Sequence, residues 1–254
     1  MIQAVSEGTD FAGAIRAFSS LDPFACRILS LYRSYRPGLA FVDYWLELDD
    51  SGKVTGAIAR NGANFILFLT DKSALDEICS FVRISGAAGI ICSGAYDLDL
   101  SMKKTSGAVL IRNAPFDSDE GLIIIEPDLR SAYDLIFSCS GEGFQPPAFE
   151  DFYVDMNHRI RHGTARIRGV KHEGRLAAVA MTVAESDDGA VLGAVACAKE
   201  YRRLGYASTV VKSITNSLVS EGKSVFLHRA KNENISFYSG LGFTECGTWQ
   251  ELIL

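Results

Sequence analysis

Three residues with the spacing of an anion-binding turn, Arg202, Gly205 and Ala207, lie between an apolar run and a helical pattern. The run, residues 190–197, is rich in Val and Ala and has no helical period, which predicts a buried strand. Residues 206–219 follow with apolar side chains spaced along one helix face. A helix begins with unpaired backbone N–H groups and a partial positive charge, and small residues let a phosphate approach the backbone. The order strand, turn, helix therefore predicts a phosphate site at the start of the helix.

This stretch resembles a known signature. Arg202-x-x-Gly205-x-Ala207 resembles the Arg/Gln-x-x-Gly-x-Gly/Ala pattern of the GNAT superfamily of acyl-CoA N-acyltransferases. Residues 195–201 are similar to that superfamily's fourth strand and its exit. An ordinary strand-to-helix connection that contains a glycine is the alternative interpretation.

A second segment, residues 232–243, resembles the closing motif of the same superfamily. Tyr238-x-x-x-Gly242-Phe243 matches that motif, in which a short helix bears a tyrosine and Gly-Phe enters a strand. Asn232, which would contact the pantetheine arm, lies six residues before Tyr238, where the superfamily usually has seven. In the second half of the chain the resemblance rests on these two motifs. In the first half it rests only on the order of the predicted helices and strands.

The resemblance implies a role for each matched residue. Backbone groups of Val195 and Cys197 would bind the pantetheine arm, and the amides that open the helix would face the pyrophosphate. Tyr238 would protonate the departing thiolate, which suits a hydroxyl with an ordinary pKa of about 10; a core aromatic packed on Phe243 is the alternative. The implied cofactor-binding set is Val195, Ala196, Cys197, Arg202, Arg203, Leu204, Gly205, Tyr206, Ala207, Ser208, Asn232 and Tyr238. The side chains of Arg202 and Arg203 would add charge, or form a solvated loop.

The general base is the least defined part of the predicted site. His228 ends a predicted strand and would act as the base if its ring faces the reacting carbonyl; a packed histidine is the alternative. Glu185, Asp187 and Asp188 precede the central strand, where three acidic residues also fit a solvated turn. Many members of the superfamily rely on a water chain instead.

The resemblance implies an acetyl-CoA-dependent N-acetyltransferase, in which a primary amine attacks the thioester directly in a ternary complex. Its expected partners are acyl-CoA, as co-substrate, and an amine-bearing small molecule or peptide, with no metal. A non-catalytic acyl-CoA sensor and a transferase for longer acyl groups are the alternatives, and Tyr238 favours an enzyme. We expect a monomer or a homodimer.

Composition excludes several other classes of protein. The chain of 254 residues has a net charge of −6, 48% hydrophobic and 22% charged residues, which is typical of a globular protein without a nucleic-acid partner. No apolar run approaches the roughly 20 residues needed to cross a bilayer, and the start lacks the pattern of a signal peptide. The six cysteines are widely spaced and indicate buried thiols, not a metal site or disulfides. We therefore expect a cytoplasmic location and no membrane partner.

Hydrophobic periodicity predicts alternating helices and short strands in both halves. In the first half the predicted helices are 11–18, 24–33 and 72–83, and the strands are 40–48, 54–59, 64–69, 89–93, 107–111 and 122–125. In the second half the helices are 129–139, 149–161, 206–219 and 234–241, and the strands are 164–170, 176–183, 190–197, 224–228, 243–246 and 249–254. The pattern predicts an α/β (α+β) fold of two tandem GNAT-like lobes, each with a mixed, largely antiparallel central sheet flanked by helices.

The shared order of elements predicts an internal duplication, with coincidence of two α/β layers as the alternative. Residues 1–126 would form a degenerate N-terminal GNAT-like lobe, and residues 127–254 the GNAT N-acetyltransferase domain. Residues 70–74, which follow the third strand of the first half, include Asp71 but no Gly or Arg. We therefore expect acyl-CoA to bind only in the second lobe.

Overall fold

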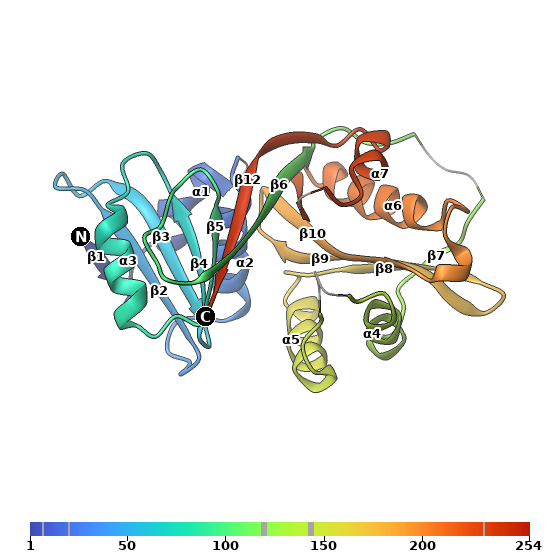
Figure 1. Cartoon of the computed structure of the whole chain (residues 1–254), viewed down its shortest axis with the longest axis horizontal. Coiled ribbons are helices and arrows are strands. Elements are labelled where there is room, and N and C mark those ends of the chain that lie inside the picture. Colours follow the sequence, from blue (N-terminus) through green and yellow to red (C-terminus); the bar gives the residue numbers. More distant parts are fainter. Residues whose placement is uncertain (7, 20, 118–120, 142–144, 231) are drawn as a thin grey trace. The chain divides into compact units, whose positions relative to one another are not determined.

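A computed structural model describes residues 1–6, 8–19, 21–117, 121–141, 145–230 and 232–254 (Figure 1). The chain forms two compact units. Unit 1 comprises residues 1–110, 228–233 and 245–254, and unit 2 comprises residues 111–227 and 234–244. After residue 126 the chain returns to unit 1 twice, at residues 228–233 and 245–254, and the predicted division at residue 126 stays a prediction.

Unit 1 is built on a mixed sheet. Its strands are β1 (Ile2–Ala4), β2 (Val42–Leu48), β3 (Val54–Asn61), β4 (Asn64–Leu69), β5 (Gly89–Ser93), β6 (Lys103–Arg112) and β12 (Thr244–Ile253). Strands β1 to β4 pair antiparallel, β4 pairs parallel with β5, and β5 pairs antiparallel with β12. The last strand of the chain thus completes the sheet of the first unit, from Trp249–Ser93 to Ile253–Gly89.

Helices cover both faces of this sheet. Helices α1 (Phe11–Ser19) and α2 (Pro23–Ser34) pack on one face, and α3 (Leu75–Ile84) packs on the other. Alternate residues of β3 divide between the faces: Ala57 and Ala59 contact the α1–α2 side, and Ile58 contacts the α3 side. Helix α2 begins at Pro23, one residue before the predicted start, because Asp22 is its N-cap and accepts hydrogen bonds from the amides of Phe24 and Ala25.

Unit 2 has the same kinds of element. Strands β7 (Ile124–Ile125), β8 (Ile167–His172), β9 (Arg175–Glu185) and β10 (Gly189–Cys197) pair antiparallel in that order. Strand β10 pairs parallel with β11 (Ser224–Ala230). Helices α4 (Leu129–Ser138) and α5 (Phe149–Arg161) lie on one face of this sheet, and α6 (Tyr206–Ser220) lies on the other (Figure 1). A short helix, α7 (Ile235–Gly240), precedes β12.

The sequence missed two features of the sheets. Strand β1 is three residues long and was not predicted. The strands predicted at 243–246 and 249–254 form one strand, β12, because Gly247 and Thr248 continue the extended backbone without a turn. The predicted internal duplication stays a prediction.

The cysteines are free thiols. Cys26, Cys79 and Cys92 are buried, Cys139 and Cys197 are partly buried, and Cys246 is exposed, so the prediction of buried thiols holds for half of them. Among the described residues no group of three or more His, Cys, Asp or Glu side chains could hold a metal ion. No helix in the described part of the chain is long and apolar enough to cross a membrane.

Candidate functional site

The predicted strand–turn–helix lies in unit 2 as β10, a short 3-10 turn (Lys199–Tyr201) and α6. Strand β10 pairs parallel with β11 from Gly189–Ser224 to Leu192–Leu227. Its register against β9 then shifts between Gly193 and Ala196, and Ala194 has a left-handed φ of 46°. This is a β-bulge, which bends a strand and re-aims its side chains. The bulge separates the half of β10 that pairs with β11 from Val195, Ala196 and Cys197, of which Ala196 and Cys197 pair with Val179 and Ala178 of β9.

The turn before α6 has two residues in the left-handed region. Arg203 has φ 65° and Gly205 has φ 87°. Alternation of this kind turns successive backbone N–H groups toward one side, which is the geometry of an anion-binding nest. A Cβ at Gly205 would meet no atom within 4 Å, so the backbone there faces open space. Gly205 is the N-cap of α6 and offers no side-chain oxygen to the first amides.

The predicted side chains of this loop surround that backbone. Arg202, Arg203 and Leu204 are exposed, and Ala207 and Ser208 are partly buried. Arg202 donates from Nε to the carbonyl of Cys197 at 3.4 Å, and the Cys139 thiol donates to the same oxygen at 3.3 Å. Burial raises the pKa of the Cys197 thiol, so it carries its proton at neutral pH. The loop thus combines exposed positive charge with backbone amides at a helix start, and both favour a phosphate.

Tyr206 holds the turn before α6 against the end of β8. Its side chain is buried, and its hydroxyl lies 2.6 Å from Nδ1 of His172 at the end of β8. The ring of Tyr201 lies 5.0 Å from that of His172. Tyr206 is the first residue of α6, so this contact holds the start of the helix on the β8–β9 hairpin.

The spacing of Tyr238, Gly242 and Phe243 has a direct structural cause at the end of α7. The Phe243 amide donates to the Tyr238 carbonyl at 3.1 Å, and the Gly242 amide donates to the Ser239 carbonyl at 2.9 Å. Gly242 has φ 67°, and the rings of Tyr238 and Phe243 meet edge to face at 6.1 Å. These are the bonds, the left-handed residue and the apolar contact of a Schellman motif. The motif sets the position of Tyr238 relative to the strand that follows.

Tyr238 is partly buried in unit 2, and burial raises the pKa of its hydroxyl to about 12. The group therefore holds its proton at neutral pH, as a general acid must. Asn232 and Asn234, on either side of the break between the units, are exposed with φ of 66° and 50°. The contact predicted for Asn232 stays a prediction.

His228 lies in unit 1, in an aromatic stack. Its ring lies 5.3 Å from that of Phe24 and stacks on Trp249 at 5.9 Å, 12° from parallel. Its Nε2 is shielded from solvent and has no hydrogen-bond partner among the described residues. Burial, with the nearby charge of Arg27, holds the pKa of His228 well below its usual value. These contacts favour the packing role that the sequence left open, and its role as a base stays a prediction.

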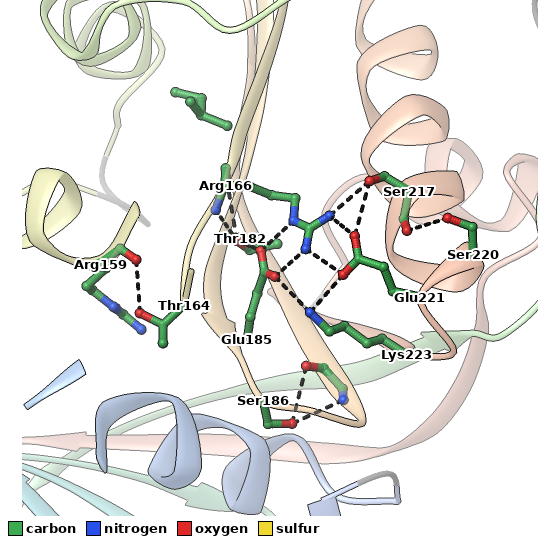
Figure 2. A network of polar contacts seen from close by, with 12 residues as sticks. Arg159, Thr164, Arg166, Thr182, Glu185, Ser186, Ser217, Ser220, Glu221 and Lys223 are labelled. Atoms are coloured by element: carbon green, nitrogen blue, oxygen red, sulfur yellow. Dashed lines mark hydrogen bonds and ion pairs between the residues drawn. The ribbon is translucent and has the colours of Figure 1, made fainter. Parts of the chain in front are cut away.

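Glu185 is part of an ionic network and does not lie in a solvated turn (Figure 2). Only 1% of its side chain is exposed; it accepts from Nε and Nη2 of Arg166 at 2.8 and 2.6 Å, and from Lys223 at 3.2 Å. Arg166 also pairs with Glu221 at the end of α6. Arg166 directly precedes β8, so the network joins the start of β8 to β9 and to the end of α6, and the Thr182 hydroxyl also donates to Oε1 of Glu185 at 2.7 Å. This position therefore favours a structural role over that of a base.

Sequence reasoning missed the residues that hold these elements from a distance. Arg112 contacts the end of α7, and Asn216 exchanges two hydrogen bonds with the backbone of Phe116, at 2.7 and 3.1 Å. Their partners lie at least 100 residues away along the chain, so no local pattern signals them.

Comparisons with known proteins agree with this architecture. Residues 168–253 match the family described as FR47-like protein. A search of curated proteins returns no match. A solved structure of a Drosophila protein superposes with a TM-score of 0.67 at 9% identity, covering 100% of this chain and 98% of the other. A tandem GNAT protein from the clavulanic acid biosynthesis pathway gives 0.60 at 13% identity, covering 100% and 98%. A GNAT-family acetyltransferase from Colwellia psychrerythraea gives 0.53 at 13% identity, covering 100% and 99%.

The chain has the fold of these GNAT structures over its whole length. The resemblance to GNAT proteins that Arg202-x-x-Gly205-x-Ala207 predicts is confirmed, and the predicted α/β fold class is confirmed with it.

Proposed function

We propose that this protein is an acyl-CoA-dependent N-acyltransferase with acetyl-CoA as its donor and a primary amine as its acceptor. The turn before α6 supports this proposal most directly. Two left-handed residues, Arg203 and Gly205, precede the helix, and the backbone at Gly205 faces open space. That geometry suits a pyrophosphate, and the rest of the donor can then extend along the bulged end of β10.

Each part of the site has a task in the proposed reaction. The amides of Arg203, Leu204, Gly205, Tyr206, Ala207 and Ser208 bind the pyrophosphate, and Arg202 adds charge. Val195, Ala196 and Cys197 offer backbone groups to the pantetheine arm, because the parallel pairing of β10 with β11 runs only from Gly189–Ser224 to Leu192–Leu227, while Ala196 and Cys197 stay paired with β9. A backbone amide near Cys197 stabilises the oxyanion that forms on the thioester carbonyl.

Tyr238 completes the reaction as the general acid. The amine attacks the thioester carbonyl, the C–S bond breaks, and the thiolate takes the proton of the Tyr238 hydroxyl. The nitrogen then loses its extra proton to give the neutral amide, and that proton returns through water to the Tyr238 oxygen. A pKa of about 12 keeps that proton in place until a basic thiolate forms. The attacking ammonium must first lose a proton, and we assign this step to water, since His228 and Glu185 are both held in packed or ionic contacts.

Two measurements test the proposal. Acetyl-CoA at 100 times its dissociation constant should stabilise the folded protein by about 2.7 kcal/mol, which raises Tm by about 5–11 °C. A library of amines, screened with a thiol reagent that detects free CoA, should then reveal an acceptor. If millimolar acetyl-CoA does not shift Tm, acetyl-CoA is not the donor. If a long-chain acyl-CoA gives a larger shift than acetyl-CoA, the transferred group is a longer acyl group.

A further inference from the structure

Arg112 makes an unusual set of contacts in unit 2. Its Nη1 donates to the carbonyls of Leu241 and Gly242 at 3.3 and 3.2 Å, and its Nη2 donates to the carbonyl of Pro115 at 2.9 Å. The guanidinium carbon lies 3.8 Å above the centre of the Phe116 ring. Each of these hydrogen bonds goes to a backbone carbonyl, so the side chain holds main-chain geometry.

The helix that Arg112 contacts needs such support. Helix α7 has six residues, its N-cap Asn234 makes no side-chain capping bond, and helices this short are unstable alone. The last carbonyls of a helix lack partners and carry partial negative charge, so a guanidinium there is favourable. Leu241 is the C-cap and Gly242 the next residue, so Arg112 binds the end of the helix that bears Tyr238.

Packing around Gly242 fits the same role. A Cβ at Gly242 would lie 2.6 Å from Nη1 of Arg112, so any other residue there would displace the guanidinium, and the left-handed φ also favours glycine. The ring centres of Phe116 and Phe243 lie 6.5 Å apart, and the Phe243 ring in turn contacts the ring of Tyr238. Because Asn216 of α6 binds the backbone of Phe116, these contacts join α7 to the helix that begins at the phosphate turn.

We propose that Arg112 is a positioning residue for Tyr238, which fixes the end of α7 so that the tyrosine hydroxyl meets the leaving thiolate. This inference rests on the proposed function, in which Tyr238 is the general acid. A displacement of about 1 Å in a catalytic group can cost about 100-fold in rate. Arg112 binds neither the donor loop nor β10 in the described residues, so its loss should change turnover and not donor affinity.

The test compares Arg112→Met, Arg112→Lys, Tyr238→Phe and the double variant Arg112→Met/Tyr238→Phe. Tyr238→Phe should lower kcat by about 100-fold, within the usual range for a general acid. Arg112→Met should lower kcat by about tenfold with an unchanged KM for acetyl-CoA, and Arg112→Lys should recover part of the loss, because lysine supplies one cation but not the planar fork. The double variant should be no slower than Tyr238→Phe, since residues that act through one group are not additive.

Two outcomes would overturn the proposal. One is a double variant whose loss equals the product of the two single losses. The other is an Arg112→Met protein that raises KM for acetyl-CoA at unchanged kcat. Arg175→Met is the matched control, because Arg175 is exposed at the start of β9, and its kcat should equal that of the wild type.

A second readout does not depend on turnover. Tyrosine labelled with ¹³C at Cζ reports ionisation by NMR, and the signal missing from Tyr238→Phe identifies Tyr238. The pKa of the Tyr238 hydroxyl should be about 12 in the wild type, where burial raises it. In Arg112→Met the pKa should lie closer to the ordinary value of about 10, because a displaced tyrosine is less buried. An unchanged titration in Arg112→Met would overturn the positioning role, even if no acyl-CoA proved to be a donor. If the titration shifts as expected but no acyl-CoA is used, the proposed function fails and the placement of Tyr238 by Arg112 stands.

Discussion

The hydroxyl of Tyr206 lies 2.6 Å from Nδ1 of His172 and joins the first residue of α6 to the end of β8. The two residues are 34 positions apart in the sequence. The ring of His172 also contacts the rings of Tyr201 and Tyr206, so the three residues form one aromatic cluster. The start of the helix is therefore held in place before any donor binds. Such preorganisation lowers the cost of ordering the loop on binding.

We expect Tyr206→Phe to weaken acetyl-CoA binding about fivefold, which corresponds to about 1 kcal/mol. The ring still fills the core, but the start of α6 loses its bond to His172. Titration calorimetry would measure the change. Tyr201→Phe removes a hydroxyl from the same cluster that makes no hydrogen bond in the described residues, and it should bind acetyl-CoA as the wild type does. Equal affinities for both variants would contradict the anchoring role of Tyr206.

Gly205→Glu should abolish the rise in Tm with acetyl-CoA. The new carboxylate would stand beside the backbone where the pyrophosphate is proposed to bind, and like charges repel at short range. The side chain has room, but φ 87° strains any residue other than glycine, so the variant should melt a few degrees lower without ligand. Differential scanning fluorimetry with and without acetyl-CoA separates the two effects.

Gly247→Glu is the control for this experiment. Gly247 lies in β12 of unit 1 with an ordinary φ, and a Cβ there also meets open space. It adds the same charge to the chain and should keep the full shift in Tm. A Gly205→Glu protein that binds acetyl-CoA like this control would show that the turn is not the site.

We expect one CoA per chain, bound in unit 2. In unit 1 the helix that follows β4 already has an anion at its start, because the Glu47 carboxylate accepts from the Ala74 amide and is 1% exposed. Asp71 adds a second negative charge in the turn. Calorimetric titration with CoA should give a stoichiometry near one for the wild type, and Gly205→Glu should show no residual binding. Two sites per chain would contradict the view that unit 1 binds no CoA.

The network of Arg166, Glu185 and Glu221 should make stability depend on pH in the acid range. The hydrogen bond from Arg166 lowers the pKa of Glu221 from 4.5 to about 2. A carboxyl whose pKa is lower in the folded state stabilises the protein above its unfolded pKa and loses that effect as the pH falls. Glu221 is 41% exposed, so solvent screening keeps the effect small.

Urea unfolding between pH 7 and pH 2 would measure this effect. The wild type should be more stable than Glu221→Gln at pH 5–7, and the two free energies of unfolding should converge between about pH 4.5 and pH 2. Glu185→Gln should cost more at neutral pH, about 3–5 kcal/mol, because it leaves Arg166 and Lys223 without a buried partner. A constant difference between wild type and Glu221→Gln at all pH values would contradict the titration of Glu221.

The sequence by itself determined the local elements and the position of the two motifs. Strands β4 and β5 and helix α5 begin and end at the predicted residues, because apolar period and turn residues are properties of neighbours in the chain. The turn at Arg202–Ala207 and the Schellman motif at Tyr238–Phe243 are local as well. Each needs only a left-handed glycine at a set distance from a helix.

The tertiary structure decided which distant residues hold those motifs. β12 is one strand with β5 and β6 as its neighbours in the sheet, and its residues Trp249–Ile253 pair with β5 of unit 1. Arg112 donates a hydrogen bond to the carbonyl of Leu241, 129 residues away in the sequence. Glu47 accepts one from the Ala74 amide at the start of α3, 27 residues away. An arginine or a glutamate has the same local pattern whether it is solvated or buried, so its partner is known only when folding brings the two together. For the same reason the sequence could not decide between a general base and a packed histidine at position 228. Only the folded structure brings Phe24 and Trp249 against the His228 ring.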